Sequence, residues 1–283
     1  RAEIIYSRDE LPLFFLSIFS PRSIFVWEAH INRFNFIIKR VIKKSTRVIA
    51  ITSALARFFK EHEPKAKYFV SPDGIDLKSF ENIAENQDGL RDMLSLPRQR
   101  KIVAYIGKYK TMSQDKGVVS LIKTFPLVRE KIPEAFLLLV GINKNELSNV
   151  GSLFAQYGIS AEGGKIVTHL PHKEAMKFLA AADVTVMNYP QVGHFTYFMS
   201  PLKLFEYMAS GRPVVTSDLP SIREILNEDC AVFFPPGNDE ALAQAIIKVL
   251  ADYPYHQGLA ARAKQLVKNY TWHERAKNII HEL

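Results

Sequence analysis

Short runs of apolar, β-branched and aromatic residues recur along the chain and alternate with segments of helical spacing. The runs are Glu3–Tyr6, Ser23–Trp27, Arg47–Ile51, Tyr68–Val70, Ile102–Ile106, Phe136–Val140, Lys165–Thr168, Val184–Met187, Pro213–Thr216 and Ala231–Phe234. Helices are predicted between most of them, for example over Val118–Val128, Ala175–Ala182 and Glu240–Leu250. Most of the runs are too apolar to alternate between a buried and an exposed face, which is typical of parallel strands covered on both sides. The pattern predicts a doubly wound α/β fold.

The predicted elements fall into two groups. Asp76–Gln99 is polar and carries no strand pattern, and a new strand–loop–helix unit begins at Lys101. Six strands follow, enough for a complete Rossmann-like domain, whereas the first group holds only three or four strands. We expect an incomplete N-terminal Rossmann-like domain over residues 1–80 and a complete one over residues 81–270. A C-terminal helix over residues 271–283 is expected to pack back on the first domain.

Composition and charge narrow the choice of partners. Hydrophobic residues make up 47% of the 283 residues, which is the balance of a globular protein with a core. The net charge of +8 favours anionic partners, but no nucleic-acid signature accompanies it, so no nucleic acid is expected. Cys230 is the only cysteine, which excludes an internal disulfide and fits a reducing, cytoplasmic compartment. The residues that follow Arg1 have the pattern of the middle of a domain, so we expect the natural protein to continue upstream.

The first candidate site follows the strand predicted at Ile102–Ile106. A polar loop leads from Gly107 to a helix that begins near Lys116–Gly117. Ligands of open α/β sheets bind outside the carboxyl ends of the strands, and helix N-termini attract phosphate. Lys108 and Lys116 bracket the loop, where they can converge on a diphosphate or simply be solvated charges. The loop is neither GxGxxG nor a Walker loop, which disfavours redox dinucleotides and P-loop chemistry.

The second candidate site is the start of a helix that follows a polar loop. Ser200 is a good N-cap, and Pro201 is favoured in a first helical turn. The free N–H groups of Leu202 and Lys203 would point at an anion, and the Lys203 side chain would add positive charge. Glu206 lies one turn further along, where a carboxylate can accept two hydrogen bonds from the vicinal hydroxyls of a ribose. A solvated helix residue is the alternative for Glu206.

In this order and spacing, the two sites resemble family 4 of the retaining glycosyltransferases, which have the GT-B fold. The family's Gly-Arg and Lys-Gly pair grips the donor diphosphate and matches Lys108 and Lys116–Gly117. The second Glu of its Glu-x7-Glu element binds the donor ribose and matches Glu206. Further matches, in order, are Glu28–His30, Val48–Ser53, Ser71–Asp76, Ser217–Pro220 and Arg223–Glu224. The resemblance covers nearly the whole chain.

The resemblance implies roles for other residues. Thr168, His169 and Leu170 stand where the family's backbone groups hold the base. His30 matches a strand-end histidine near the donor sugar, with a core or surface histidine as its ordinary alternative. The resemblance therefore places His30 with the two lysines of the first site among the catalytic candidates.

Two features depart from the family's pattern. Phe198 stands where the first Glu of Glu-x7-Glu would contact the donor sugar, so sugar recognition falls to nearby polar residues such as His194 and Thr196. The family's first strand and its Gly-rich acceptor loop are not found in the sequence. Both departures bear on the sugar and the acceptor and leave the nucleotide site as predicted.

The segment Ile31–Lys44 predicts a basic amphipathic helix. Such a helix fits an anionic membrane surface, and a packed helix with a solvated basic face fits equally well. The longest apolar stretches, such as Leu11–Phe19, are shorter than the ~20 residues of a spanning helix. We therefore expect a cytoplasmic protein, and a peripheral position on the inner face of the membrane is one of the two alternatives that this helix leaves open.

Together these features predict a retaining transferase of hexosyl type. Its donor would be a UDP- or GDP-linked sugar, and its acceptor a hydroxyl of a carbohydrate or of a lipid-linked acceptor in cell-surface polysaccharide or glycolipid synthesis. No cofactor or metal is expected, because the lysines and a helix dipole would stabilise the departing diphosphate and no metal-ligand spacing is present. The alternatives are a non-catalytic nucleotide-sugar-binding remnant and a sugar-nucleotide epimerase of similar architecture.

Overall fold

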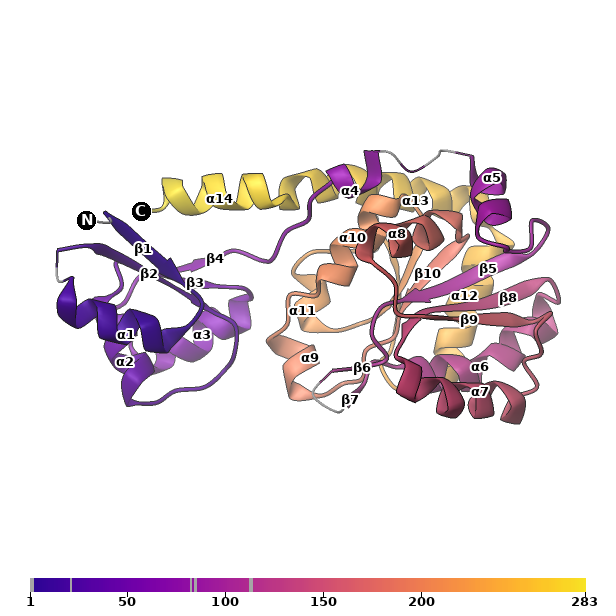
Figure 1. Ribbon diagram of the computed structural model, residues 1–283, viewed down its shortest axis with the longest axis horizontal. Coiled ribbons are helices and arrows are strands. Elements are labelled where there is room, and N and C mark those ends of the chain that lie inside the picture. The colour runs from indigo at the N-terminus through magenta and orange to yellow at the C-terminus, as the bar shows by residue number, and fades with distance from the viewer. Residues whose placement is uncertain (1–2, 21, 82, 84–85, 112–113) are drawn as a thin grey trace. The chain divides into compact units, whose positions relative to one another are not determined.

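The computed structural model describes residues 3–20, 22–81, 83, 86–111 and 114–283. The chain forms two compact units, each with a parallel sheet of its own (Figure 1). The first unit comprises Arg1–Ile75, Val192–Pro201 and Asn269–Leu283, and the second comprises Asp76–Gln191 and Leu202–Lys268. The sequence did not anticipate that Val192–Pro201 groups with the first unit.

The first unit has a four-stranded sheet in the order β1-β2-β3-β4. Its strands are β1 (Ile4–Ser7), β2 (Ile24–Ala29), β3 (Arg47–Ala50) and β4 (Tyr68–Val70). Its helices are α1 (Glu10–Phe19), α2 (Phe36–Lys44), α3 (Ser53–His62), α9 (Gly193–Tyr197) and α14 (Trp272–His281).

Side chains of successive strand residues point to opposite faces of this sheet. Trp27 and Val48 are buried in the cluster that α1, α2 and α3 cover. Their neighbours Val26 and Ile49 pack against Ile279 of α14. Figure 1 shows the same division, with α1, α2 and α3 along one face and α14 along the other. Both faces are thus buried, as the apolar strands predict.

The second unit has a six-stranded sheet in the order β12-β11-β10-β5-β8-β9. Its strands are β5 (Lys101–Ile106), β8 (Ala135–Ile142), β9 (Gly164–Thr168), β10 (Val184–Met187), β11 (Val214–Ser217) and β12 (Val232–Phe234). The chain passes from β5 outward to β9 and then returns to β10 on the other side of β5. At such a reversal, neighbouring connections leave to opposite faces and open a crevice at the carboxyl ends of the two central strands. The first place to look for a site is therefore where β5 and β10 end.

Helices cover both faces of the second sheet (Figure 1). One layer contains α6 (Val118–Lys131), α7 (Leu147–Gln156) and α12 (Asp239–Ala251), and the other contains α5 (Gln87–Met93), α8 (His172–Ala181), α10 (Leu202–Ser210) and α13 (Tyr253–Leu266). The remaining elements are α4 (Lys78–Glu81), α11 (Pro220–Arg223), the 3-10 turns Lys144–Glu146 and Val267–Tyr270, and the hairpin strands β6 (Lys110–Thr111) and β7 (Gln114–Asp115).

Each strand expected from the sequence is present, with ends that differ by a residue or two. The short hairpin of β6 and β7 was not expected, because its strands are polar. Within the described part of the chain, no helix has both the length and the apolar character that crossing a membrane requires.

Candidate functional site

Two glycines shape the loop that leaves β5. Gly107 has φ +139°, and a Cβ there would lie 2.8 Å from Cε of Lys203. Gly117 has φ +87°, and a Cβ there would lie 1.6 Å from the carbonyl oxygen of Asn188, the residue that follows β10. The Asn188 amide donates hydrogen bonds to the Gly117 carbonyl at 3.2 Å and to Oγ of Ser120 at 2.9 Å. The end of β10 is therefore tied to the start of α6 at a distance that only glycine permits.

Lys203 places its ammonium group inside this crevice. The residue is 8% exposed, and its Nζ lies 3.6 Å from the centroid of the Tyr105 ring and 5.6 Å from that of Tyr189. Among the described residues, this buried nitrogen has no hydrogen-bond partner. Burial lowers the pKa of Lys203 well below its usual value, the charge of Lys116 lowers it further, and Glu206 opposes them. A buried amine without a partner is costly, so an anion that reached this nitrogen would be bound favourably.

The two lysines of the β5 loop lie near each other. Burial, and then the charge of Lys108, lowers the pKa of the half-buried Lys116. Lys108 itself is exposed. Lys116 in turn acts on Lys203, so the structure brings together the three cations that the sequence assigned to two separate motifs. Positive charges that lower one another's pKa repel each other, and a polyanion bound among them would relieve this repulsion.

The N-terminus of α6 is already occupied. The Asp115 carboxylate accepts the N–H groups of Val118 at 3.0 Å and Val119 at 3.2 Å. Burial raises the pKa of this carboxyl against the lowering effect of those hydrogen bonds. A carboxylate of the protein thus takes the position in which this helix start would receive a phosphate. The start of α10 lies at the exposed Leu202, and its phosphate-binding role stays a prediction.

Glu206 is half-buried. Its Oε1 lies 2.7 Å from Nε2 of His172, the first residue of α8. The sequence did not anticipate this contact. No local signal could have found it, because α8 and α10 are brought together only by the sheet.

The segment predicted to hold the base leads from β9 into α8. Thr168 ends the strand, and the N–H of His169 donates to the carbonyl of Ile142 at 3.0 Å. Thr168 and Leu170 are half-buried and His169 is exposed. The segment thus lies next to His172 in the chain, and His172 contacts Glu206, the residue predicted to bind the ribose.

A second polar cluster lies in the first unit, at the end of β2. Nε2 of His30 lies 2.5 Å from Oε1 of the buried Glu28, and Arg275 of α14 donates to Oε2 of Glu28 at 3.0 Å. The Tyr6 hydroxyl also donates to Glu28. Burial alone would raise the pKa of Glu28, but His30 and Arg275 outweigh it and lower the pKa overall.

Asp73 completes a group with Glu28 and His30 whose ligand atoms lie within 4.8 Å of one another. Such spacing suits a metal ion, yet the oxygens of Glu28 already accept hydrogen bonds from three groups. Arg275 also brings a positive charge that would repel a cation. The arrangement favours a hydrogen-bonded network over a metal site.

The residues predicted to recognise the sugar lie in Val192–Pro201, the segment that belongs to the first unit. The Thr196 hydroxyl is buried and donates to the carbonyl of Val192 at 2.9 Å, which makes it a poorer candidate than the half-buried His194. Phe198 packs edge-on against Phe58, with ring centroids 6.4 Å apart. The position of the family's first Glu is therefore part of an apolar contact.

Residues at the end of the same segment also make contacts inside the first unit. Ser200 was expected to cap α10, but its hydroxyl accepts the N–H of Asp73 at 2.8 Å. Pro201 is buried beside it in the chain, and α10 begins at the next residue.

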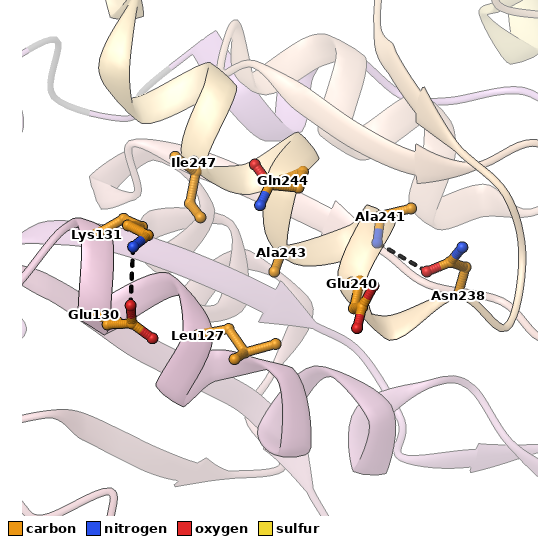
Figure 2. Close-up of a pocket in the computed structure, with 9 residues that line it drawn as sticks. All are labelled: Leu127, Glu130, Lys131, Asn238, Glu240, Ala241, Ala243, Gln244 and Ile247. Carbon is orange, nitrogen blue, oxygen red and sulfur yellow. Dashed lines mark hydrogen bonds and ion pairs between the residues drawn. The ribbon is translucent and has the colours of Figure 1, made fainter.

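A groove of about 420 Å³ between α6 and α12 contains none of the predicted site residues (Figure 2). Figure 2 shows that Glu130 pairs with Lys131 and that Asn238 accepts the N–H of Ala241 as the cap of α12. These polar groups pair with each other or cap a helix, so the groove is not the candidate site.

The comparisons with known proteins agree with this geometry. Residues 100–252 match the model of the family described as glycosyl transferases group 1. The chain belongs to this family. It is 27% identical over 206 residues to a phosphatidyl-myo-inositol mannosyltransferase of Mycolicibacterium smegmatis, covering 71% of this chain and 47% of the relative. It is 23% identical over 213 residues to the putative teichuronic acid biosynthesis glycosyltransferase TuaC of Bacillus subtilis, covering 74% and 48%.

The glycosyl transferases group 1 chain also resembles solved structures. It superposes on Anabaena HepE in complex with UDP with a TM-score of 0.79 at 18% identity, covering 99% of this chain and 78% of the other. The likeness confirms the α/β fold as GT-B. The chain spans about half the length of the two curated relatives described above.

Proposed function

We propose that this glycosyl transferases group 1 protein moves a sugar from a nucleoside diphosphate sugar to an acceptor hydroxyl with retention of configuration. The observation that carries the proposal is the buried amine of Lys203 near the ends of β5 and β10, which has no hydrogen-bond partner among the described residues, with Lys116 close to it. A diphosphate is the ligand that three clustered lysine side chains and a helix start suit best. The complex of HepE with UDP supports the same class of donor.

In this proposal, different residues bind the diphosphate, the ribose and the base of the donor. Lys108, Lys116 and Lys203, with the start of α10 at Ser200–Leu202, hold the diphosphate. Glu206 accepts hydrogen bonds from the ribose hydroxyls, and these replace its contact with His172. The backbone of Thr168, His169 and Leu170 holds the base.

The chemistry in this proposal rests on charge stabilisation. As the bond from the sugar to the diphosphate breaks, negative charge grows on the leaving oxygens, and preorganised cations lower the energy of that state. Lys108 and Lys116 supply those cations, and neither a metal nor a cofactor is required. His30 acts at the sugar, held by Glu28, and His194 contributes to sugar recognition.

The acceptor in this proposal is a carbohydrate or a lipid-linked acceptor, in line with the two curated relatives. The helix α2 supports contact with an anionic membrane surface. Lys39, Arg40, Lys43 and Lys44 are exposed on it, and Phe36 at its start is 73% exposed. Co-sedimentation with phosphatidylglycerol vesicles tests this contact, and binding that does not fall when Arg40 and Lys44 are replaced by Gln would contradict it.

A second candidate function has one observation in its favour. Phe198 replaces the sugar-binding Glu and is packed against Phe58, so no carboxylate can serve there. A nucleotide-sugar-binding protein without transfer activity would have the same features. Binding of UDP or GDP without any turnover of the corresponding sugars would establish it.

The test is incubation of the protein with UDP-glucose and GDP-mannose, together with a membrane or oligosaccharide acceptor extract. Released nucleotide, the anomeric configuration of the product and any epimerised donor are measured in the same samples. We expect transfer with retention, lost in Lys116→Ala and kept in Lys131→Ala, a change at the exposed end of α6. Equal activity of the two variants would exclude the proposed site.

A further inference from the structure

Arg275 joins three separate parts of the first unit. It lies on α14, and its Nε donates to the carbonyl of Pro72 at 2.7 Å. Its Nη1 donates to Glu28 at 3.0 Å, and its Nη2 donates to the carbonyl of Ser71 at 3.2 Å. All three nitrogens of the guanidinium are therefore engaged. One side chain thus links the C-terminal helix to the end of β2 and to the turn after β4.

The carboxylate that Arg275 holds also orients His30. Nε2 of His30 faces Glu28, whereas Nδ1 lies 3.2 Å from Nη2 of Arg8. A guanidinium can only donate, so Nδ1 is the acceptor and the ring proton lies on Nε2, directed at Glu28. A neutral His30 therefore has a single tautomer and a single ring orientation. Two groups set them, the Glu28 carboxylate at Nε2 and Arg8 at Nδ1, and of the two only Glu28 is buried and bound to Arg275.

Glu28 depends on Arg275 for its charge. Its side chain is 5% exposed, and burial by itself favours the protonated carboxyl. Removing one partner of a buried pair leaves the other charge uncompensated, so the carboxyl takes up a proton or turns away. In either case it stops accepting the His30 proton in its present geometry. The orientation of His30 is thus determined by a residue that lies 247 positions away from Glu28 in the sequence.

We propose that Arg275 and Glu28 are positioning residues for His30, so that the C-terminal helix α14 aligns the group expected to act at the donor sugar. This inference rests on the proposed function for the role of His30 in transfer. The alignment itself is a property of the first unit and can be measured without any substrate. The alignment of His30 and its role in transfer can therefore be disproved separately.

The chain offers a matched control at the other end of α14. Arg47 of β3 donates through Nε to the carbonyl of Glu282 at 2.8 Å, and its Nη2 lies 3.4 Å from the Glu282 carboxylate. Arg47→Met and Arg275→Met each remove one arginine that anchors the last helix to the sheet. Only Arg275 contacts the group that binds His30. A purely structural role of α14 predicts similar effects of the two changes.

The first measurement is the ¹⁵N and ¹H spectrum of the histidine rings, with the His30 signals identified by their loss in His30→Gln. In the unaltered protein we expect the Nε2–H tautomer at pH 8. Arg275→Met is expected to give mixed tautomers, and Arg47→Met is expected to leave the signals unchanged. Glu28→Gln keeps Arg275 in place and tests the same link if Arg275→Met fails to fold. An unchanged His30 tautomer in a folded Arg275→Met or Glu28→Gln protein would overturn the proposal.

The second measurement is turnover of the donor sugar on which the unaltered protein is active. Misplacing a catalytic group by about 1 Å costs up to 10²-fold in rate, so we expect a fall of kcat of roughly ten- to a hundredfold in Arg275→Met and little change in Arg47→Met. The Kd for UDP or GDP should stay the same, since Lys108, Lys116, Lys203 and Glu206, which bind the nucleotide in the proposed function, belong to the second unit. Arg275→Lys should recover part of kcat, because it restores the positive charge but not the several N–H donors of the guanidinium. Normal kcat in Arg275→Met overturns this inference alone, whereas no turnover in the unaltered protein contradicts the proposed function.

Discussion

Lys203 holds its amine 3.6 Å from the centre of the Tyr105 ring, in space that Gly107 leaves open by having no side chain. Proteins normally give a buried amine a hydrogen-bond partner, and here no described residue provides one. The arrangement is unfavourable for the protein alone and favourable for a complex with an anion. It therefore agrees with the proposed function, in which Lys203 binds the donor at some expense of stability.

Replacing Lys203 by Met separates these two effects. Met fills a similar space without a charge, so we expect the free energy of unfolding to rise by about 1–3 kcal/mol, the usual cost of an unsatisfied buried polar group. The Kd for UDP or GDP should rise about tenfold, because a charge-assisted contact is lost. Chemical denaturation and calorimetric titration measure the two quantities. Lys131→Met is the control, and a variant that loses stability while binding normally would contradict this account.

The stability of the protein should depend on pH through Lys203. Its pKa in the folded state lies well below that of the unfolded chain, so between the two values the unfolded state binds more protons. Stability then rises with pH across that window, and the contribution is lost as pH falls through the folded-state pKa. We expect the stability gap between Lys203→Met and the unaltered protein to narrow from about pH 7 to about pH 9.5. A gap that is constant over this range would show that Lys203 stays charged in the folded protein.

Gly117 should tolerate no side chain. Its φ of +87° is unfavourable for other residues, and a Cβ would lie 1.6 Å from the Asn188 carbonyl oxygen. We expect Gly117→Ala to lower the free energy of unfolding by at least about 2–3 kcal/mol, since both backbone strain and overpacking contribute. Gly151→Ala is the matched control, because Gly151 lies inside α7 with open space around it. That change should stabilise the protein by up to about 1 kcal/mol, and a similar loss in both variants would argue against the close approach.

Glu206 should discriminate ribose from sugars that lack its hydroxyls. In Glu206→Ala we expect the Kd for UDP to rise by roughly tenfold, the range for a hydrogen bond to a charged group. The Kd for 2′,3′-dideoxyuridine diphosphate should be nearly the same in the variant and the unaltered protein. Isothermal titration of both nucleotides gives the comparison. Equal losses for the two ligands would mean that Glu206 supports the site through His172 rather than through the ribose.

The order of elements was predictable because parallel strands buried on both faces need continuous apolar runs. Val103 and Leu137, for example, are fully buried in neighbouring strands, and both come from runs recognised in the sequence. The hairpin of β6 and β7 had no such signal, because its strands are polar and pair only with each other. Its position matters because it lies within the loop that carries Lys116.

The site was predictable in part. Lys108, Lys116 and Glu206 were found because they stand next to strand ends and helix starts, which are local features of the chain. That Asp115 takes the N-terminus of α6 was missed, although an acidic residue just before a helix is a common cap. The contact between His172 and Glu206 could not be found, because these residues are 34 positions apart and their two helices must first be placed on one sheet.

The sequence by itself determined the class of fold and the identity of the residues near the strand ends, because hydrophobic periodicity and the preferences of Gly, Pro and Ser act over a few neighbouring positions. Only the tertiary structure decided that the buried amine of Lys203 finds no hydrogen-bond partner among the described residues and that Arg275 binds Glu28. Burial and ion pairing depend on what the rest of the chain brings near a side chain. Local preferences contain no information about partners that lie hundreds of residues away.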